Sequence, residues 1–590
     1  MLLPENIITA ERAPTIPALF SERVRSTPDA VAYRFFDALN GMWAEISWRD
    51  MAGQVAQWQM AFMREKLQPG DRVAIMARNS RLWVVFDQAA LSLGLVVVPL
   101  FSDDRADNVH YILDDAGVKF LLIGGPPQWE RLQGKLEGSR SLQRIVSIAA
   151  PDGGSDKRLL HLGAWLSGKP SEPVILPTVA AADLASIVYT SGTTGHPKGV
   201  MLSHWNIISN AYSGLQAVPV YRTDVFLSFL PLSHTLERTV GYYLPMMAGA
   251  SVAHARSVQE LAKDLLEVRP TGLISVPRIY ERVYARVMED LLAKSPIISY
   301  LFRLTVAVGW RRFEYQQGRQ SWSLRLLVWP LLKRLVADRI TQKMGGRLRV
   351  AISGGAALSA EIARVFTALG VPVLQGYGLT EASPVVSVNR LDRNMPMSIG
   401  PALPGVDIRI GDNEELLVLG DNVMIGYWND SAETKRVIDS EGWLHTGDKA
   451  RIQDGFLYIT GRIKDIIVLA NGEKVSPADM ELAIGMDPLF HQVLVIGEAK
   501  PYLCALVVVD QKQWERDITV DNQADAEPVL LDRIAKCLHE FPGYAAVKRV
   551  MVIAEPWTIE NDMLTPTLKI KRSKVLEFYA EEVKSMYEGH

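Results

Sequence analysis

Eleven consecutive residues combine hydroxyl groups, glycines and one lysine, the residue types that bind phosphate. They run Tyr189-Thr190-Ser191-Gly192-Thr193-Thr194-Gly195-His196-Pro197-Lys198-Gly199. Glycines let backbone N–H groups approach an anion, hydroxyls add donors, and the lysine supplies a mobile positive charge. The segment follows an apolar run, LASIVYT (184–190), which predicts a buried strand. We therefore predict a phosphate-binding loop whose ligands are Thr190, Ser191, Gly192, Thr193, Thr194, Gly195 and Lys198.

This loop differs from a Walker A loop, in which Gly-Lys-Ser/Thr leads directly into a helix. Here Pro197 precedes Lys198 and Gly199 follows it. The next residues, VMLSH (200–204), predict a strand, with a helix beginning only near Trp205. The alternative is a solvated surface turn, but this composition directly after a buried strand favours phosphate binding.

Six further motifs follow in a fixed order along the chain. They are LPLSH (230–234), SGGAAL (353–358), GYGLTEAS (376–383), WLHTGD (443–448), GRIKD (461–465) and TPTLKIKR (565–572). Together with the loop, they resemble the adenylate-forming enzymes: acyl-CoA synthetases, peptide-synthetase adenylation domains and luciferases. The resemblance runs from about residue 20 to the end of the chain and is greatest to the long-chain fatty acyl-CoA synthetases.

The resemblance implies an α/β fold with two domains. A large N-terminal domain (1–461) is expected to contain two α/β subdomains and a distorted β-barrel. A small, mobile α+β domain (462–590) is expected to follow. The implied reaction joins a fatty acid to AMP using ATP and Mg²⁺, and CoA then displaces AMP.

The resemblance also implies roles for the residues of the motifs. Glu381 and Thr190 are expected to hold Mg²⁺, and one carboxylate suits an ion that keeps much of its hydration. Thr380 is expected to contact the α-phosphate, and His234 to lie where the acyl carboxylate meets the adenylate. The remaining nucleotide contacts are expected from Ser353, Gly354, Gly355, Ala356, Gln375, Gly376, Tyr377, Gly378, Asp448 and Arg462, with Tyr377 stacking on adenine and Asp448 binding the ribose.

Three residues of the expected small domain complete the set of predicted site residues. Lys569 aligns with the catalytic lysine of the family, although Leu568 stands where the motif usually has glycine. Lys464 is expected to be the hinge of a domain rotation between adenylation and thioester formation. That rotation would bring Gly472 close to the pantetheine of CoA. For each site residue the alternative is a structural role, such as turn capping or a solvated surface position.

The spacing of apolar residues predicts the elements that carry these motifs. Strands separated by helices predict parallel sheets. The pattern of the sequence changes near residue 461, and this change places a domain boundary at 461–465. The predicted elements are a helix at 47–67, strands at 71–77, 119–125 and 144–150, a surface loop at about 151–180, a helix that begins at Ser476-Pro477, a hairpin at 492–510, a helix at 529–541 and a strand at 547–554.

Composition narrows the class of protein. The chain has 590 residues, a formal net charge of -3 and only two cysteines, Cys504 and Cys537. The near-neutral charge argues against nucleic-acid binding, and two cysteines exclude a disulfide scaffold and a Cys-rich zinc site. No stretch reaches the ~20 uninterrupted apolar residues of a membrane span, and the N-terminus lacks the pattern of a signal peptide. A cytoplasmic enzyme is therefore predicted.

Residues 296–343 are unusually basic. They contain nine Lys or Arg against two acids, Glu314 and Asp338, together with Trp310, Trp322 and Trp329. One interpretation is a helix lying at an anionic membrane surface. The other is a packed helical excursion with a solvated basic face, and the sequence leaves both open.

Two rival functions also stay open at this level. An acyl carrier protein could accept the acyl group in place of CoA, or the chain could be a non-catalytic, membrane-associated lipid-binding homologue. Intact Lys198, Glu381, Asp448 and Lys569 argue against loss of catalysis. The sequence determines neither the preferred acyl length nor the oligomeric state.

Overall fold

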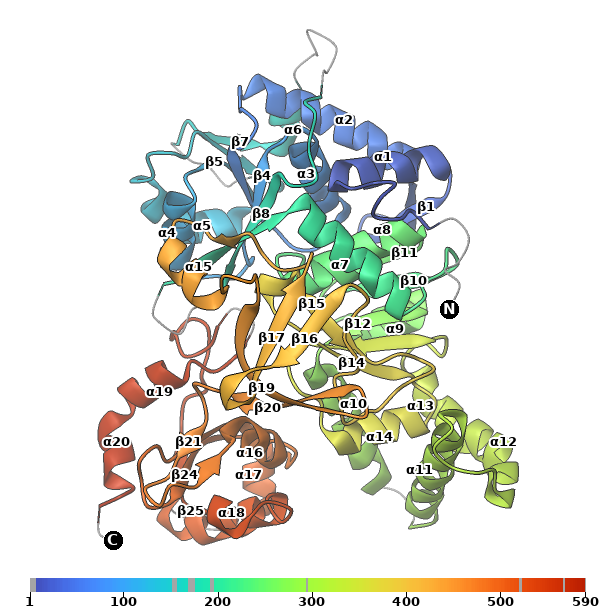
Figure 1. Cartoon of the computed structure of the whole chain (residues 1–590), viewed down its shortest axis with the longest axis vertical. Coiled ribbons are helices and arrows are strands. Elements are labelled where there is room, and N and C mark those ends of the chain that lie inside the picture. Colours follow the sequence, from blue (N-terminus) through green and yellow to red (C-terminus); the bar gives the residue numbers. More distant parts are fainter. Residues whose placement is uncertain are drawn as a thin grey trace. The chain divides into compact units, whose positions relative to one another are not determined.

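The computed structural model describes residues 7–150, 156–167, 176–190, 196–292, 296–518, 523–565 and 568–588. The chain divides into two compact units (Figure 1). The large unit comprises residues 1–409, 417–445 and 453–457, and the small unit comprises 410–416, 446–452 and 458–590. A large N-terminal unit and a smaller C-terminal unit, both built from helices and sheets, confirm the predicted α/β class.

The first sheet of the large unit carries the segment that is predicted to bind phosphate. Its order is β18-β9-β8-β4-β3-β5-β6-β7. Pairing is parallel from β8 through β7 and antiparallel at β8/β9 and β9/β18. The strands are β3 (Arg72–Met76), β4 (Val96–Pro99), β5 (Val118–Ile123), β6 (Arg144–Ser147), β7 (Leu159–His161), β8 (Leu184–Thr190), β9 (Lys198–Ser203) and β18 (Gly426–Tyr427).

The second sheet of the large unit has the order β15-β14-β13-β12-β10-β11-β1-β2. It is parallel except at its two ends, where β14/β15 and β1/β2 are antiparallel. The strands are β1 (Val31–Asp37), β2 (Met42–Ser47), β10 (Val225–Ser228), β11 (Ser251–His254), β12 (Gly272–Ser275), β13 (Val350–Ser353), β14 (Val373–Gly378) and β15 (Val385–Val388). Buried parallel strands and crossover helices explain why these segments are so uniformly apolar.

Helices link and cover these strands (Figure 1). They are α1 (Ile16–Ser26), α2 (Trp48–Arg64), α3 (Arg81–Ser92), α4 (Ala106–Asp115), α5 (Pro126–Leu136), α7 (His204–Ala217), the π-helix η1 (Glu237–Tyr243), α8 (Leu244–Ala248), α9 (Leu261–Val268), α10 (Pro277–Leu292), α11 (Pro296–Gln316) and α14 (Ala360–Ala368). The helix predicted over 47–67 is α2. It begins where Ser47 accepts from the backbone N–H of Asp50 and the Asp50 carboxylate accepts in return from that of Ser47.

The prediction of a surface loop at 151–180 is wrong for part of that segment. Residues 156–167 form β7, which pairs with β6, and the short helix α6 (Leu162–Leu166). Trp165 of α6 is buried, and its ring centroid lies 5.1 Å from that of Phe62. The packing of this one aromatic side chain outweighs the polar, Gly-rich composition from which the loop was predicted. Residues 151–155 and 168–175 lie outside the described residues.

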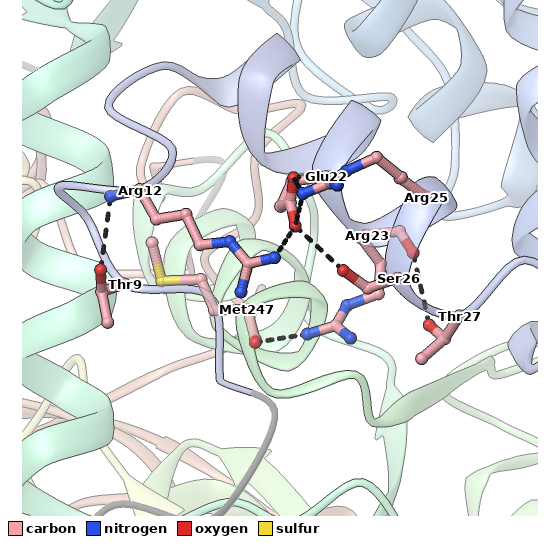
Figure 2. Close-up of polar contacts among 8 residues, drawn as sticks. All are labelled: Thr9, Arg12, Glu22, Arg23, Arg25, Ser26, Thr27 and Met247. Carbon is pink, nitrogen blue, oxygen red and sulfur yellow. Dashed lines mark hydrogen bonds and ion pairs between the residues drawn. The ribbon is translucent and has the colours of Figure 1, made fainter.

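A buried arginine anchors the N-terminal helix to the large unit. Arg23 of α1 donates from Nε to the carbonyl of Met246 at 2.8 Å. Its second terminal nitrogen donates to the carbonyl of Met247 at 2.6 Å (Figure 2). These carbonyls belong to the last turn of α8, where a positive charge interacts favourably with the helix dipole. Burial lowers the pKa of Arg23 to about 10, so the side chain stays charged at neutral pH.

A separate four-stranded sheet follows the strands of the second sheet along the chain. Its order is β16-β17-β19-β20, and the division into compact units falls among its residues. The strands are β16 (Val406–Ile410), β17 (Glu415–Gly420), β19 (Leu444–Gln453) and β20 (Phe456–Arg462), with the 3₁₀ turn η5 (Asp412–Glu414) between the first two.

The small unit is an α+β fold around the sheet β23-β24-β25. The predicted hairpin is confirmed as antiparallel β23 (Phe490–Ile496) and β24 (Leu503–Val509), and the predicted strand as β25 (Val547–Ile553). Pro477 begins α16 directly after Ser476, as predicted. The other elements are β21 (Ile467–Val468), β22 (Lys474–Val475), α16 (Pro477–Ile484), α17 (Gln511–Asp517), α18 (Gln523–Cys537), η6 (Gly543–Ala545), α19 (Arg572–Phe578) and α20 (Ala580–Ser585).

The helices of the described ranges are too short or too polar to cross a bilayer.

Candidate active site

The segment with the predicted phosphate ligands connects β8 to β9. The two strands are antiparallel, and Thr190 pairs with Lys198, so these residues face each other where the connecting segment leaves the sheet. Strand β9 leads into α7, whose first turn is capped by Ser203; this confirms the predicted strand-then-helix order and the difference from a Walker A loop. The central residues Ser191, Gly192, Thr193, Thr194 and Gly195 lie outside the described residues.

Lys198 contacts an anionic group that the sequence did not predict. Its Nζ lies 2.5 Å from Oε1 of Glu433, a residue of α15 (Ser431–Val437). Hydrogen bonds from Arg436 and from Lys198 lower the pKa of Glu433 to about 2. Lys198 therefore already holds a carboxylate oxygen, and a phosphate oxygen presents the same charge and acceptor chemistry.

Tyr427 lies between Lys198 and Glu381. The hydroxyl of Tyr427 donates to Oε1 of Glu381 at 2.8 Å, while Nζ of Lys198 lies 5.5 Å from the centroid of its ring. Strand β18 places Tyr427 here because it pairs with β9, where Tyr427 is opposite Val200. Burial, and secondly the charge of Glu381, raise the pKa of Tyr427, so it stays a protonated donor.

Glu381 belongs to the short helix η4 (Thr380–Ala382) after β14. Its backbone carbonyl accepts from the N–H of Met424 at 2.9 Å, which fixes this turn against the segment leading to β18. Among the described residues there is no group of three or more His, Cys, Asp or Glu that could hold a metal alone. Glu381 would therefore offer a single carboxylate ligand, which fits Mg²⁺ that is held mainly by phosphate oxygens and water.

Two of the nucleotide motifs lie side by side. Ser353 ends β13 and pairs with Gln375 of β14, so SGGAAL and GYGLTEAS leave the same edge of the sheet. Gln375 is buried; its Oε1 accepts from the N–H of Leu358 at 3.1 Å and its Nε2 donates to the carbonyl of Pro396. Its side chain thus fixes the turn that contains Gly354, Gly355 and Ala356.

Small residues are required in these turns by close backbone packing. A Cβ on Gly378 would lie 2.1 Å from the carbonyl oxygen of Pro384, and one on Gly376 would lie 3.1 Å from that of Ser387. Gly355 has φ +80°, a conformation that favours glycine. Tyr377, between Gly376 and Gly378, is half-buried, as is Thr380.

His234 lies in the turn before η1. Its Nδ1 accepts from the backbone N–H of Leu236 at 3.2 Å, so the neutral ring carries its proton on Nε2. The side chain of Leu236 in turn lies against the SGGAAL turn, since a Cβ on Gly354 would be 3.2 Å from it. This contact connects the LPLSH segment with the nucleotide motifs.

A second group of predicted site residues lies within the small unit. Nε of Arg462 donates to Oδ1 of Asp448 at 2.9 Å, and the Asp448 side chain is only 6% exposed. Lys569 as a whole residue is exposed, but its ammonium end is crowded by protein atoms. Burial of this end and the charge of Arg462 lower the pKa of Lys569, while the charge of Asp448 opposes them. The structure thus brings these three residues together.

The residue before this lysine has a backbone conformation that favours glycine. Leu568 has φ +61°, in the left-handed region. Its N–H donates to the carbonyl of Thr565 at 2.8 Å, and the N–H of Thr565 donates to the carbonyl of Lys569 at 2.8 Å. The leucine therefore keeps the turn that presents Lys569.

Lys464 and Gly472 occupy exposed turns of the small unit. Lys464 lies between β20 and β21, where the N–H of Asp465 donates to the carbonyl of Arg462 at 3.1 Å. Gly472 has φ +86° and no atom within 4 Å of a Cβ built on it, so the space beside it is open.

Two mostly parallel α/β sheets, a segment with the predicted phosphate ligands, and Glu381 linked to Lys198 through Tyr427 fit an adenylate-forming enzyme. The chain belongs to the AMP-binding enzyme family: the family pattern matches residues 20–428, and that of the AMP-binding enzyme C-terminal domain matches residues 464–590.

Relatives and solved structures agree with this assignment. The long-chain-fatty-acid–CoA ligase FadD15 of Mycobacterium bovis is 30% identical over 593 residues, 97% of each chain. The chloroplastic long-chain-fatty-acid–acyl-carrier-protein ligase AEE15 of Arabidopsis thaliana is 28% identical over 584 residues, covering 88% of this chain and 79% of that protein. The anthranilate CoA ligase AuaEII, solved with anthranoyl-AMP, shares the fold with a TM-score of 0.74, 19% identity and 99% coverage of both chains.

Proposed function

We propose that this protein is an AMP-forming long-chain fatty acid–CoA ligase that uses ATP, Mg²⁺ and CoA. The observation that carries the proposal is the group formed by Lys198, Tyr427 and Glu381, which combines a phosphate-binding cation with a carboxylate suited to Mg²⁺. The likeness to long-chain-fatty-acid–CoA ligases over nearly the whole chain supports the substrate class.

In the first step, a carboxylate oxygen of the fatty acid attacks the α-phosphorus of ATP. The bond from that phosphorus to the bridging oxygen breaks, and pyrophosphate leaves. Both reactants are anionic, so the protein must supply positive charge and donors. Lys198, together with the loop residues, would neutralise the β- and γ-phosphates; Thr380 would donate to the α-phosphate; Nε2 of His234 would donate to the acyl carboxylate. Bound Mg²⁺ would supply further charge, held at Glu381 and, in this proposal, at Thr190.

The small unit would serve both steps in turn. For adenylation, Lys569 would place its ammonium against the charge that develops on the phosphate, while Asp448 and Arg462 bind the ribose. For thioester formation, the thiol sulfur of CoA attacks the acyl carbonyl, AMP leaves and the thiol proton is released. We place the domain boundary at 461 and the hinge at Lys464, with Gly472 leaving room for pantetheine after rotation.

The proposal extends to partners and location. Fatty acid and CoA are the substrates. A cytoplasmic location, with reversible contact between an anionic membrane surface and residues 296–343, belongs to the same proposal because long-chain acids partition into lipid.

The experiment is product analysis over a panel of C2 to C20 acids with ATP and Mg²⁺, with CoA added or withheld. We expect pyrophosphate and acyl-AMP without CoA, and acyl-CoA with it, best with long acids. Glu381→Gln should lower the rate of pyrophosphate release by about two orders of magnitude, by analogy with other losses of transition-state charge stabilisation. Transfer to a free acyl carrier protein and none to CoA would overturn the acceptor assignment, and a rate within threefold of wild type for Glu381→Gln would overturn its metal role.

A further inference from the structure

Residues 324–342 form one continuous helical run on the periphery of the large unit. The run consists of η2 (Leu324–Val328), α12 (Trp329–Leu332), η3 (Lys333–Ala337) and α13 (Asp338–Gln342). It packs on α11, which in turn packs on α14 (Figure 1). The inner side of the run is buried there: Trp329, Leu332 and Ala337 share one apolar cluster with Phe302 and Val308 of α11.

The opposite side of the run is also apolar, but it is exposed. We call it the outer face; its members are Leu324 (72% exposed), Leu327 (66%), Val328 (45%), Leu331 (61%) and Leu335 (41%), and Trp322 (51%), two residues before the run, adds a sixth exposed apolar side chain. Steps of three and four residues separate the leucines, which puts them on one side of a helix. A helix that is apolar on two opposite sides is normally covered on both. Six large apolar side chains close together are more than scattered surface residues, and such patches mark interaction sites.

The run itself carries a net positive charge. Arg325, Arg334 and Arg339 belong to the same run and are exposed. Its one acid, Asp338, already forms an ion pair with Lys333 at 2.6 Å. An apolar face bordered by arginines matches a surface that combines an apolar interior with anionic groups at its boundary, as an anionic bilayer does.

The structure also separates these arginines from others that the sequence grouped with them. The guanidinium of Arg312 lies 5.3 Å from the ring centroid of Trp329, and burial lowers its pKa. Arg319 pairs with Glu314 and donates to the carbonyl of Asn394. These two side chains hold α11 in place. The basic residues of 296–343 therefore do not form one uniform surface, and the charge relevant to docking lies on the helical run.

We infer that the outer face inserts into the interface of an anionic lipid bilayer, with Arg325, Arg334 and Arg339 at the lipid phosphates. The leucines would lie at the boundary between headgroups and acyl chains. The inference narrows the membrane contact of the proposed function to one face. It concerns binding alone, so it is tested without catalysis and stands or falls separately from the ligase activity.

The test is co-sedimentation of the full chain with vesicles of phosphatidylcholine containing phosphatidylglycerol, or of phosphatidylcholine alone. We expect binding to the anionic vesicles that weakens as salt rises. The triple variant Leu327→Gln, Leu331→Gln, Leu335→Gln should bind at least about tenfold more weakly, because each leucine loses apolar burial. The control variant replaces exposed apolar residues elsewhere, with Leu39→Gln, Val258→Gln and Leu266→Gln, and should bind as wild type does.

A second variant separates charge from apolar contact. Arg325→Gln, Arg334→Gln, Arg339→Gln should lower binding to anionic vesicles and reduce its salt dependence, with the far-UV circular dichroism spectrum unchanged. Equal binding by wild type and the leucine triple variant would overturn the inference. A second result would also overturn it: light scattering shows that the wild type is a dimer and the leucine triple variant a monomer, and neither binds vesicles. The occupant of the outer face would then be a second copy of the chain.

Discussion

Replacing Tyr427 by phenylalanine isolates one hydroxyl group at the centre of the proposed site. The change removes the bond from Tyr427 to Oε1 of Glu381 but keeps the ring beside Lys198. In the proposed reaction, Glu381 must present its oxygens to Mg²⁺ in one orientation. Without the hydroxyl, the carboxylate samples other rotamers and loses the donor that fixes it.

The size of the effect follows from the kind of hydrogen bond. A bond to a charged group contributes about 1.5–3 kcal/mol, and 1.36 kcal/mol corresponds to a factor of about ten in rate. We therefore expect Tyr427→Phe to lower kcat for pyrophosphate release about 10- to 100-fold and to raise the Mg²⁺ concentration needed for half-maximal rate. The KM for fatty acid should stay within about threefold, because the acyl contacts are unchanged.

The matched control is Tyr284→Phe, which removes a similar bond to Glu361 (2.7 Å) on helices α10 and α14. It should leave both kcat and the Mg²⁺ requirement unchanged. The assay is continuous pyrophosphate release from palmitate and ATP over a range of Mg²⁺ concentrations. Wild-type kcat and an unchanged Mg²⁺ requirement in Tyr427→Phe would refute the positioning role, and an equal loss in the control would refute its specificity.

Three other predictions follow from single residues. Glu433→Gln should lower the KM for ATP a few-fold, since ATP would no longer compete with a carboxylate for Lys198, an ion pair worth about 0.2–1 kcal/mol when partly exposed; a raised KM would show instead that Glu433 positions the lysine. Lys569→Ala should lower adenylation about 100-fold or more but leave thioester formation from synthetic acyl-AMP and CoA nearly intact, and an equal loss in both assays would contradict this division. Burial raises the pKa of Glu237 to about 8 in the folded state against 4.5 in the unfolded chain, so its contribution to the free energy of unfolding is fully present below pH 4.5 and is lost as pH rises toward 8. Urea unfolding at pH 5.5 and 8.5 should therefore show a difference between wild type and Glu237→Gln that changes by about 3 kcal/mol, and a constant difference would mean that Glu237 is ionised when folded.

Local patterns predicted the elements that depend on short-range signals. The run 184–190 is β8 over the predicted residues, and Ser476-Pro477 begins α16. In both cases the strand or helix is specified by neighbours in sequence, either an apolar run or a capping residue. The segment 156–167 was missed because its one anchor, Trp165, acts through contacts with distant aromatic side chains.

The candidate site shows the same difference between short-range signals, which the sequence reveals, and long-range contacts, which it does not. Sequence motifs identified Lys198 and Glu381, but not Tyr427 or Glu433. Glu433 lies 235 positions from Lys198 in the chain, and Tyr427 reaches Glu381 only because β18 pairs with β9. Such long-range pairings leave no periodic trace in a single sequence. The outer face could not be predicted from the sequence for a related reason. An apolar residue on a helix is expected to be buried, and only the positions of its neighbours show that it is exposed.

The central claim is that this chain joins a long-chain fatty acid to AMP before it transfers the acyl group to CoA. The most direct measurement is a rapid-quench experiment with enzyme, palmitate, ATP and Mg²⁺, analysed by mass spectrometry. We predict enzyme-bound palmitoyl-AMP, formed together with an equal amount of pyrophosphate, that converts to palmitoyl-CoA and AMP when CoA is added. Formation of palmitoyl-CoA with ADP and phosphate, or hydrolysis of ATP without any acyl-AMP, would contradict the account.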